Sequence, residues 1–347
     1  MDAVQKQCLV GMTLDEITGA TKDLSLPSYL PREIAIWVYK RGAVSIDHFT
    51  NISKKHRQEL NERFEVGLSP YVKVSTSTDG TRKYLYKALA NRYIESAYIP
   101  DIKRHTLCIS SQVGCKLGCL FCMTGKQGFQ GHLTSNQILN QILSLPERRL
   151  LTNLVFMGMG EPFDNIEITL KTLEILTAEW GLSFSPRKIT VSTIGIIPGM
   201  KRFLEETKCQ LAISMHSPFE NERAMLMPAE NVYPIRKIVE ILKAFPINKR
   251  RNVSFEYILF KGLNDSPRHI NQLARLLNGL KCKINLMRFH PIPESPLMGT
   301  DDKALIDFRD RLNAKGITAT IRASRGEDIL AACGLLSTKE INKNMSK

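Results

Sequence analysis

From about residue 105 onward, short apolar runs alternate with helix-like stretches, and this alternation limits the possible folds more than any other feature. Stretches with helical character separate the runs at 135–145, 166–179 and 266–277. Strands that alternate with helices build parallel βαβ units, so this region is predicted to be α/β and to form a full or partial barrel. The predicted strands are 106–110, 153–157, 188–192, 210–214, 253–258, 283–287 and 318–322.

The first hundred residues have a different pattern. Residues 10–65 are predicted to be helical, with Pro31 in the first turn of one helix, Gly42 at its end and a second helix over 53–64. The Asp79-Gly80 pair lies between two strand-like runs and predicts a hairpin, and a third strand follows at 93–99. The predicted organisation therefore has four parts. They are a helical accessory, RNA-binding domain (1–70), a β extension (71–100), the barrel with its C-terminal cysteine loop (101–337) and a flexible tail (338–347).

Composition indicates a partner and a compartment. The chain carries 48 Lys and Arg against 34 Asp and Glu, a net charge of +14. Such an excess attracts polyanions, so nucleic acid is the preferred class of partner. No run of eighteen apolar residues is present and the N-terminus lacks a secretory pattern, so no membrane association is expected. Eight cysteines without an export signal favour the cytoplasm, where thiols serve metals and chemistry.

Three of these cysteines form a short loop directly after the first predicted barrel strand. Cys115, Cys119 and Cys122 are spaced by three and two residues, and Phe121 precedes the last of them. A zinc site completed by Cys108 or His105 is one interpretation. A [4Fe–4S] cluster held by three thiolates, with its fourth iron open, is the favoured one. In its spacing the loop resembles that of the radical S-adenosylmethionine (SAM) enzymes, whose open iron binds the methionine end of SAM.

Further polar residues follow the next strands, at the barrel edge where chemistry is expected. Gly160 and Glu161 belong to a Gly-Met-Gly-Glu-Pro motif, in which glycines permit close approach and the carboxylate suits the SAM amino group. The other predicted cofactor-binding residues end later strands, and each taken alone is as readily a buried or surface polar group. They are Ser192, Ser214, Met215, His216 and His290.

Cys333 lies far from the cysteine loop, within Ala-Ala-Cys-Gly. A lone cysteine is ordinarily a small buried hydrophobe. Because no bulky apolar residue adjoins it here, it is also a possible nucleophile that faces a cavity.

Together these motifs resemble the RlmN/Cfr family of radical SAM RNA methyltransferases, over about Tyr93 to Ser337. The resemblance rests on the segment 94–100, the segment 108–122, the Gly-Met-Gly-Glu-Pro motif and Ala-Ala-Cys-Gly. It implies a partial (β/α) barrel of the radical SAM type, with a [4Fe–4S] cluster on Cys115, Cys119 and Cys122.

The resemblance also implies a mechanism that consumes two SAM per turnover. One SAM methylates Cys333, and the second, cleaved reductively at the cluster, yields a radical that takes hydrogen from this methyl group. The resulting carbon radical adds to an adenine ring, and Glu95 removes the ring proton as a base. Cys108 then attacks Cys333, so that a transient disulfide releases the methylated RNA. A low-potential donor such as flavodoxin or ferredoxin and a monomeric state are expected.

Two regiochemistries remain within this family. RlmN enzymes methylate carbon 2 of an adenosine in 23S rRNA and of the adenosine 3′ to the anticodon in tRNA, whereas Cfr-like enzymes modify carbon 8 of the rRNA adenosine and confer antibiotic resistance. Pro162 matches RlmN, whereas residues 192–198 and 216–218 are closer to Cfr, and His290 replaces the usual RlmN asparagine. The prediction is RlmN. The remoter alternatives are a radical SAM enzyme with a non-RNA substrate and a zinc-bearing RNA-binding module.

Overall fold

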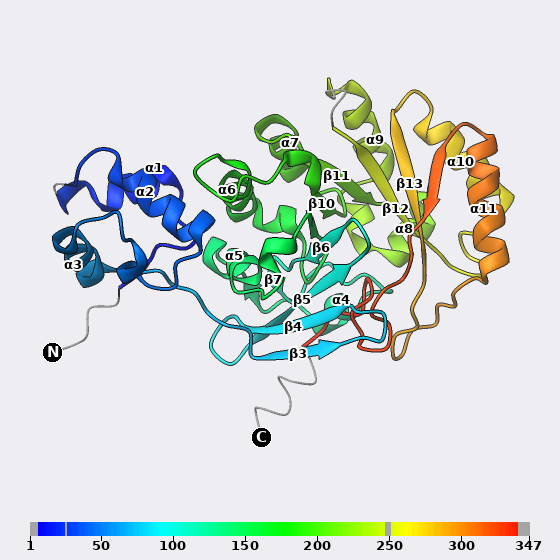
Figure 1. The fold of residues 1–347 in the computed structure, drawn as a ribbon. Helices are drawn as coiled ribbons and strands as arrows, with labels where there is room; N and C mark the ends of the chain where they lie inside the picture. The colour runs from blue at the N-terminus through cyan, green and yellow to red at the C-terminus, as the bar shows by residue number, and fades with distance from the viewer. Residues whose placement is uncertain (1–5, 25, 247–250, 339–347) are drawn as a thin grey trace.

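The computed structural model describes residues 6–24, 26–246 and 251–338, and a single ten-stranded sheet organises them (Figure 1). Its strand order is β14-β13-β12-β11-β10-β9-β6-β5-β4-β3. The predicted flexible tail lies, apart from Thr338, outside the described residues. Along the described chain, no helix is long and apolar enough to cross a membrane.

Seven of these strands are parallel and follow one another across the sheet in chain order, with a helical connection between most neighbours. Within the described residues β14 does not pair with β6, whose outer edge is taken by β5, so the barrel stays open. The predicted partial α/β barrel is therefore confirmed. The strands are β6 (His105–Cys108), β9 (Asn153–Phe156), β10 (Ile189–Thr193), β11 (Gln210–Ser214), β12 (Val253–Leu259), β13 (Cys282–Arg288) and β14 (Thr318–Ile321).

Helices on the outer face of the parallel strands cover their apolar side chains (Figure 1). Three of them, α5, α10 and α11, begin with a side-chain cap. Thr134 forms a capping box with Gln137 at the start of α5, and Asp301 caps α11. The helices are α5 (Ser135–Leu143), α6 (Ile166–Thr177), α7 (Ile197–Glu206), α8 (Glu220–Leu226), α9 (Ile235–Ala244), α10 (Pro267–Leu277) and α11 (Asp302–Ala314).

The segment before the barrel extends the same sheet with antiparallel strands. These are β3 (Lys73–Thr76), β4 (Arg82–Lys87) and β5 (Tyr93–Pro100). The turn between β3 and β4 contains Asp79, whose carboxylate accepts the Thr81 N–H at 2.8 Å, and Gly80 at a φ of 84°. A hairpin with Asp-Gly in its turn is what the sequence predicts.

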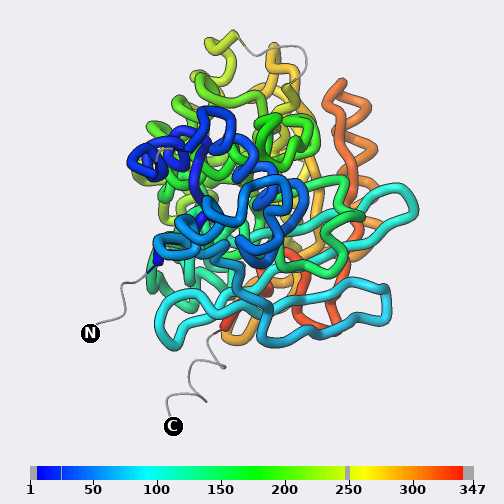
Figure 2. Tube along the Cα trace, turned by 60° about the vertical axis from the view of Figure 1, so that its left-hand side comes forward, coloured from blue at the N-terminus to red at the C-terminus, as the bar shows by residue number. Residues whose placement is uncertain are grey.

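Residues 6–66 form a small, mainly helical unit that packs beside α5 and α6, as Figures 1 and 2 show. The Ser135 hydroxyl donates to the Gly11 carbonyl at 2.8 Å, and Lys171 pairs with Glu16 at 2.6 Å. Gly42, left-handed at a φ of 70°, ends the helix that begins near Pro31, as predicted. The unit contains β1 (Gln7–Cys8), α1 (Leu14–Ala20), α2 (Leu30–Ile36), a π-helical continuation (Trp37–Arg41), α3 (Lys54–Arg63) and β2 (Phe64–Glu65).

A fully buried ion pair holds together the ends of two central strands. Arg223 in α8 pairs with Glu230 and is completely inaccessible to solvent. Its second guanidinium nitrogen donates to the carbonyls of Ile194 and Ser214, at 2.7 and 2.9 Å. These carbonyls follow or end β10 and β11, so this arginine fixes the strand ends that carry polar residues.

We predict that Arg223→Met lowers the free energy of unfolding by about 3–5 kcal/mol, because Glu230 is left as an uncompensated buried charge. Chemical denaturation followed by circular dichroism measures this loss. The matched control is Arg202→Met in α7, which removes an exposed arginine paired with Glu206. A midpoint for Arg223→Met as little changed as that of the control contradicts the assigned role.

Candidate functional site

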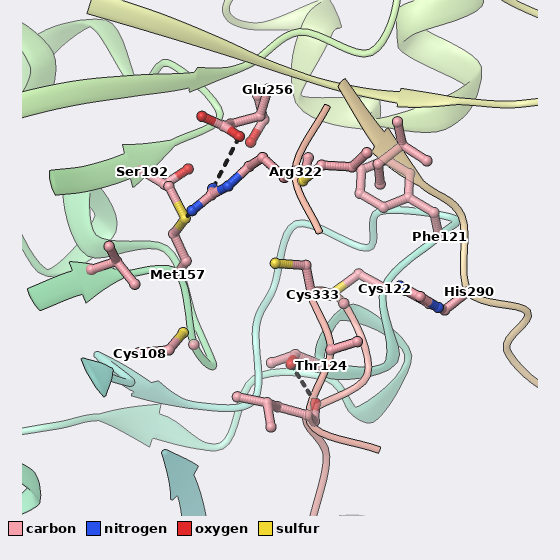
Figure 3. Close-up of a pocket in the computed structure, with 18 of the residues that line it drawn as sticks. Cys108, Phe121, Cys122, Thr124, Met157, Ser192, Glu256, His290, Arg322 and Cys333 are labelled. Atoms are coloured by element: carbon pink, nitrogen blue, oxygen red, sulfur yellow. Dashed lines mark hydrogen bonds and ion pairs between the residues drawn. The ribbon is translucent and has the colours of Figure 1, made fainter. Parts of the chain in front are cut away.

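The C-terminal ends of the parallel strands surround a cavity of about 460 Å³. Cysteines from three separate segments line it. Cys108 ends β6, Cys333 lies on the loop after β14, and the remaining three belong to the cysteine loop between β7 (Gln112–Val113) and α4 (Met123–Gln127). In Figure 3, the Cys333 sulfur turns toward the side of the cavity where Cys108, Met157 and Arg322 lie. All five cysteines are free thiols in the structure.

The cysteine loop starts at a turn that only glycine accommodates easily. Gly114 has a φ of 72°, and a Cβ there would lie 1.7 Å from the Gly128 carbonyl oxygen. Beyond it the loop closes on itself through the Cys122 N–H, which donates to the Cys119 carbonyl at 3.1 Å. Cys122 is then the N-cap residue of α4. The three thiols therefore enter one cavity from one short loop.

The three thiols of this loop line one cavity, where they fit an iron–sulfur cluster held by three cysteines. Burial raises the pKa of Cys115 to about 12 and raises the pKa values of Cys119 and Cys122, so a positively charged group is needed to keep them as thiolates. Among the described residues, no group of three or more His, Cys, Asp or Glu side chains is placed to hold a metal ion. A zinc site needs ligands that converge on one point. A cluster of four irons is broader, and three separated thiols around a cavity fit it.

The Gly-Met-Gly-Glu-Pro motif brings the loop after β9 close to the chain that leads into the cysteine loop. A Cβ at Gly158 would lie 2.6 Å from the Ser110 hydroxyl oxygen, and one at Gly160, which has a φ of 100°, would lie 2.5 Å from Gln112 Cβ. Both glycines also line the cavity. Their lack of a side chain therefore serves packing within the protein, in addition to the ligand access that the sequence suggested.

Glu161 is 4% exposed, and its carboxylate lines the cavity. It accepts the N–H groups of Phe163 and Ile194, each at 2.9 Å, and so joins the loops after β9 and β10. Burial raises its pKa to about 7, although these hydrogen bonds oppose the rise. A cation in the cavity, such as an ammonium group, would favour the ionised carboxylate.

The predicted cofactor-binding residues on the next two strands divide into two groups. Ser192 and Ser214 line the cavity and are half-buried. His216 also lines it, and its Nδ1 accepts the Ile258 N–H at 3.0 Å, so the proton of the neutral ring is on Nε2. Burial lowers the pKa of His216 to about 3. Met215, in contrast, is completely buried in the hydrophobic core and is absent from the cavity wall.

His290 follows β13 and connects the cavity wall to the loop that carries Cys333. Its Nε2 lies 3.0 Å from the Ser324 hydroxyl, and its Nδ1 lies 3.7 Å from the Glu327 carboxylate. Burial lowers its pKa. In this structure, His290 is therefore engaged by the C-terminal loop while it lines the cavity.

Cys108 and Cys333, which are 225 positions apart in the sequence, share one electrostatic environment. Burial and, to a lesser extent, the nearby Cys333 raise the pKa of Cys108 to about 12, although Arg322 opposes the rise. Burial also raises the pKa of Cys333, and Arg322 opposes that rise too. Cys333 is nevertheless exposed to the space of the cavity. Arg322 is thus placed to stabilise either thiolate.

Glu95 lies outside the cavity wall, on the middle of β5. It is 4% exposed and is covered by the C-terminal loop. Its carboxylate accepts the Ser337 N–H at 3.0 Å and pairs with Lys83 at 3.0 Å. The predicted catalytic residues therefore meet at one loop, although in this conformation only the two cysteines among them reach the cavity.

Sequence reasoning did not select two charged residues that complete the site, Glu256 and Arg322. Glu256 on β12 is buried, accepts from the Asn285 amide at 2.7 Å and pairs with Arg322 at 3.3 Å. Arg322 also approaches the Met157 sulfur at 3.4 Å. A charged residue inside the apolar run of β12, and an arginine directly after the last strand, were signals available in the sequence.

The chain matches two family models. Residues 109–275 match the radical SAM superfamily, and residues 8–66 match the ribosomal RNA large subunit methyltransferase N-terminal domain. A probable dual-specificity RNA methyltransferase RlmN from Parabacteroides distasonis is 54% identical, over 96% of this chain and 98% of the relative. The dual-specificity RNA methyltransferase RlmN of Syntrophus aciditrophicus is 42% identical, over 96% of this chain and 97% of its own length.

A solved structure has the same architecture. The crystal structure of a radical SAM methyltransferase from Sphaerobacter thermophilus matches with a TM-score of 0.88 at 38% sequence identity. The match covers 95% of this chain and 99% of that one. The similarity thus extends over the barrel, the β extension and the N-terminal unit together.

We predict that replacing Cys115, Cys119 or Cys122 singly with Ala abolishes binding of the iron–sulfur cluster, because two thiolates cannot replace three. Iron content and absorbance after anaerobic reconstitution measure this. The matched controls are Cys209→Ala and Cys282→Ala, whose cysteines are absent from the cavity wall. Full iron content in Cys119→Ala would contradict the assignment of these cysteines as cluster ligands.

Proposed function

This chain belongs to the RlmN family of radical SAM RNA methyltransferases, and from that premise we propose that it methylates carbon 2 of adenosine in two kinds of RNA. The proposed targets are an adenosine of 23S rRNA and the adenosine 3′ to the anticodon of tRNAs. One observation carries the proposal. Cys108 and Cys333 lie on the same cavity as the three-cysteine loop, beside one arginine.

The side chains have distinct roles in this proposal. Cys115, Cys119 and Cys122 would hold the [4Fe–4S] cluster, which when bound supplies the electron for reductive cleavage of SAM. Glu161 would bind the SAM amino group, because its buried carboxylate lines the cavity and is fixed by two N–H donors. Ser192, Ser214 and His216 would contact the rest of SAM from the neighbouring strand ends, and His290 from the opposite wall.

Cys333 would act as the carrier of the methyl group. As a thiolate it takes the methyl of a first SAM, forming its S–C bond while the sulfonium–methyl bond breaks. After a second SAM has enabled removal of a hydrogen atom from this methyl group, the carbon bonds to the adenine ring. Glu95 would accept the proton that the ring carbon loses, and the adduct would also give up one electron, equal to the one consumed in the cleavage of SAM.

Cys108 would end the cycle. Its thiolate attacks the Cys333 sulfur, so a disulfide forms and the bond between this sulfur and the methylene carbon breaks. The carbon takes a proton and remains on the RNA as the new methyl group. A cellular thiol or an equivalent reductant must then reduce the disulfide.

Arginines at the cavity suit an RNA substrate. Arg104, Arg288 and Arg325 line it together with Arg322, against three carboxylates, Asp101, Glu161 and Glu256. Arg104 and Arg288 are largely exposed, and Arg288 pairs with Asp302 at 2.5 Å. Phosphates on either side of a target nucleotide would meet positive charge at this mouth, in a chain whose net charge is +14.

The remaining partners follow from this chemistry. A low-potential protein such as flavodoxin or ferredoxin would supply the electron, and the enzyme would act as a monomer in the cytoplasm, where its RNA substrates are. Carbon 8 of the rRNA adenosine is the competing target, because residues 192–198 and 216–218 resemble the Cfr pattern.

We predict that RNA from cells lacking this protein loses 2-methyladenosine at one rRNA position and in a subset of tRNAs, and that the wild-type gene restores both. Mass spectrometry of nuclease-digested rRNA and tRNA separates the carbon 2 and carbon 8 isomers. Restoration of 8-methyladenosine alone, or of neither isomer, contradicts the proposed regiochemistry.

We predict that Cys108→Ala accumulates protein bound covalently to RNA through Cys333 and a methylene group, because no thiol is available to release the product. Denaturing gels with and without ribonuclease, followed by peptide mass spectrometry, detect this adduct. Cys209→Ala removes another buried cysteine and is the control. Absence of the adduct from Cys108→Ala protein loaded with its cluster makes the methyl-cysteine route untenable.

A further inference from the structure

We propose that Lys83 is a positioning residue for Glu95, which keeps this carboxylate charged and aligned with the loop that carries Cys333. The inference rests on the proposed function, in which Glu95 accepts the ring proton. Lys83 was not among the residues that the sequence pointed to, and it does not line the cavity.

The register of the strands places Lys83 on the same face of the sheet as two proposed catalytic residues. Lys83 on β4 is opposite Ala97 on β5, and Ala97 is opposite Cys108 on β6. Because alternate residues of a strand share a face, Glu95 points to the same side as Ala97. Ala331, from the loop that carries Cys333, packs against Ala97 and Cys108 on this face.

The Lys83 ammonium group connects Glu95 directly to the C-terminal loop. Its Nζ lies 3.0 Å from one carboxylate oxygen of Glu95 and 3.4 Å from the Leu330 carbonyl. The other carboxylate oxygen accepts the Ser337 N–H at 3.0 Å. Lys83 and Glu95 belong to the sheet, whereas Leu330 and Ser337 belong to the loop that covers them.

The C-terminal loop covers Glu95 and has to move before this carboxylate can contact RNA. Glu95 reaches the adenine ring only when the loop over it is displaced, since its carboxylate is 5% exposed. Displacement removes the Ser337 N–H from the carboxylate, but Lys83 remains beside it on the neighbouring strand. Lys83 is thus the partner that stays with the base when RNA enters.

The charge of Lys83 favours the ionised form of Glu95, which a base requires. Burial raises the pKa of Glu95, while the charge of Lys83 and its hydrogen bond, and to a lesser extent the Ser337 N–H, oppose that rise. The groups that face Glu95 are Lys83 from β4 and the loop amide of Ser337, whereas Cys108 lies on the same face of the sheet opposite Ala97. Without the ammonium charge, the carboxyl group would bind a proton at a higher pH and could not accept another.

Stability alone gives little reason for this pair. The two side chains are 15% and 5% exposed, and desolvation of such a pair often costs as much as the attraction returns. Apolar residues at both positions 83 and 95 would pack on the same face without that cost. A requirement for a charged carboxylate at position 95 accounts for the lysine.

The test uses the full chain with reconstituted cluster and compares Lys83→Gln, Lys83→Arg and the control Lys87→Gln. Lys87 is an exposed lysine on the same strand. Single-turnover RNA methylation is measured against pH, and mass spectrometry of Cys333 methylation in the same samples reports whether each variant folds and binds SAM. Glu95→Gln serves as the variant without a base.

For Lys83→Gln we expect the acid side of the pH–rate profile to move up by about one pH unit or more, with a loss of about tenfold or more at neutral pH that is recovered on raising the pH. Cys333 methylation stays normal. Lys83→Arg and Lys87→Gln retain the wild-type profile, since a cation remains beside Glu95 in both.

The outcomes separate this inference from the proposed function. If the wild-type enzyme methylates no RNA, the proposed function itself is wrong. Active wild type with an unshifted profile in Lys83→Gln overturns the role of Lys83 alone. Full activity in Glu95→Gln overturns both the role of Glu95 as base and the role of Lys83. If Lys83→Gln does not fold, the pH–rate profile of a folded Lys83→Arg tests the proposal instead. Arginine keeps a permanent positive charge beside Glu95, so an acid side of the profile that moves to higher pH in this variant also overturns the proposal.

Discussion

Hydrogen bonds on both flanks hold the loop that carries Cys333 against the open side of the barrel. On one flank, the β3–β4 turn binds it, since the Ser77 hydroxyl donates to Asp328 at 2.6 Å and Asp79 accepts the Gly326 N–H at 2.9 Å. On the other, α4 binds it through the Thr124 hydroxyl, which donates to the Leu336 carbonyl at 2.6 Å. The proposed methyl carrier, Cys333, has to be placed against both SAM and RNA, and these contacts position the loop that carries it.

The attachment explains why the β extension belongs to the same sheet as the barrel. A separate hairpin would move independently of Cys108, whereas β5 is paired with β6 and fixes the hairpin relative to it. The hairpin, the loop and α4 then form one connected wall. Both the proposed carrier and the proposed resolving thiol are positioned by this wall and not by the parallel strands alone.

Burial sets the second constraint, because thiols and carboxylates in an apolar cavity lose their charges unless partners oppose the loss. Glu161 has two N–H donors, Arg322 faces both cysteines and is held by Glu256, and Glu95 has Lys83. Each group with a proposed role in reaction or binding thus has a neighbour that stabilises its charged form.

The sequence by itself determined the α/β class, the order of the strands, the cysteine loop, the family and the cavity positions of Ser192, His216 and Cys333. Those features are local, because strand periodicity, cysteine spacing and short motifs depend only on residues that are close together in the chain. Tertiary structure alone decided that Met215 is a core residue, that Gly158 and Gly160 make room for Ser110 and Gln112, and that Glu95 lies covered beside Lys83. Those features depend on pairing register and on how a distant loop packs, and neither is encoded in the spacing of neighbouring residues.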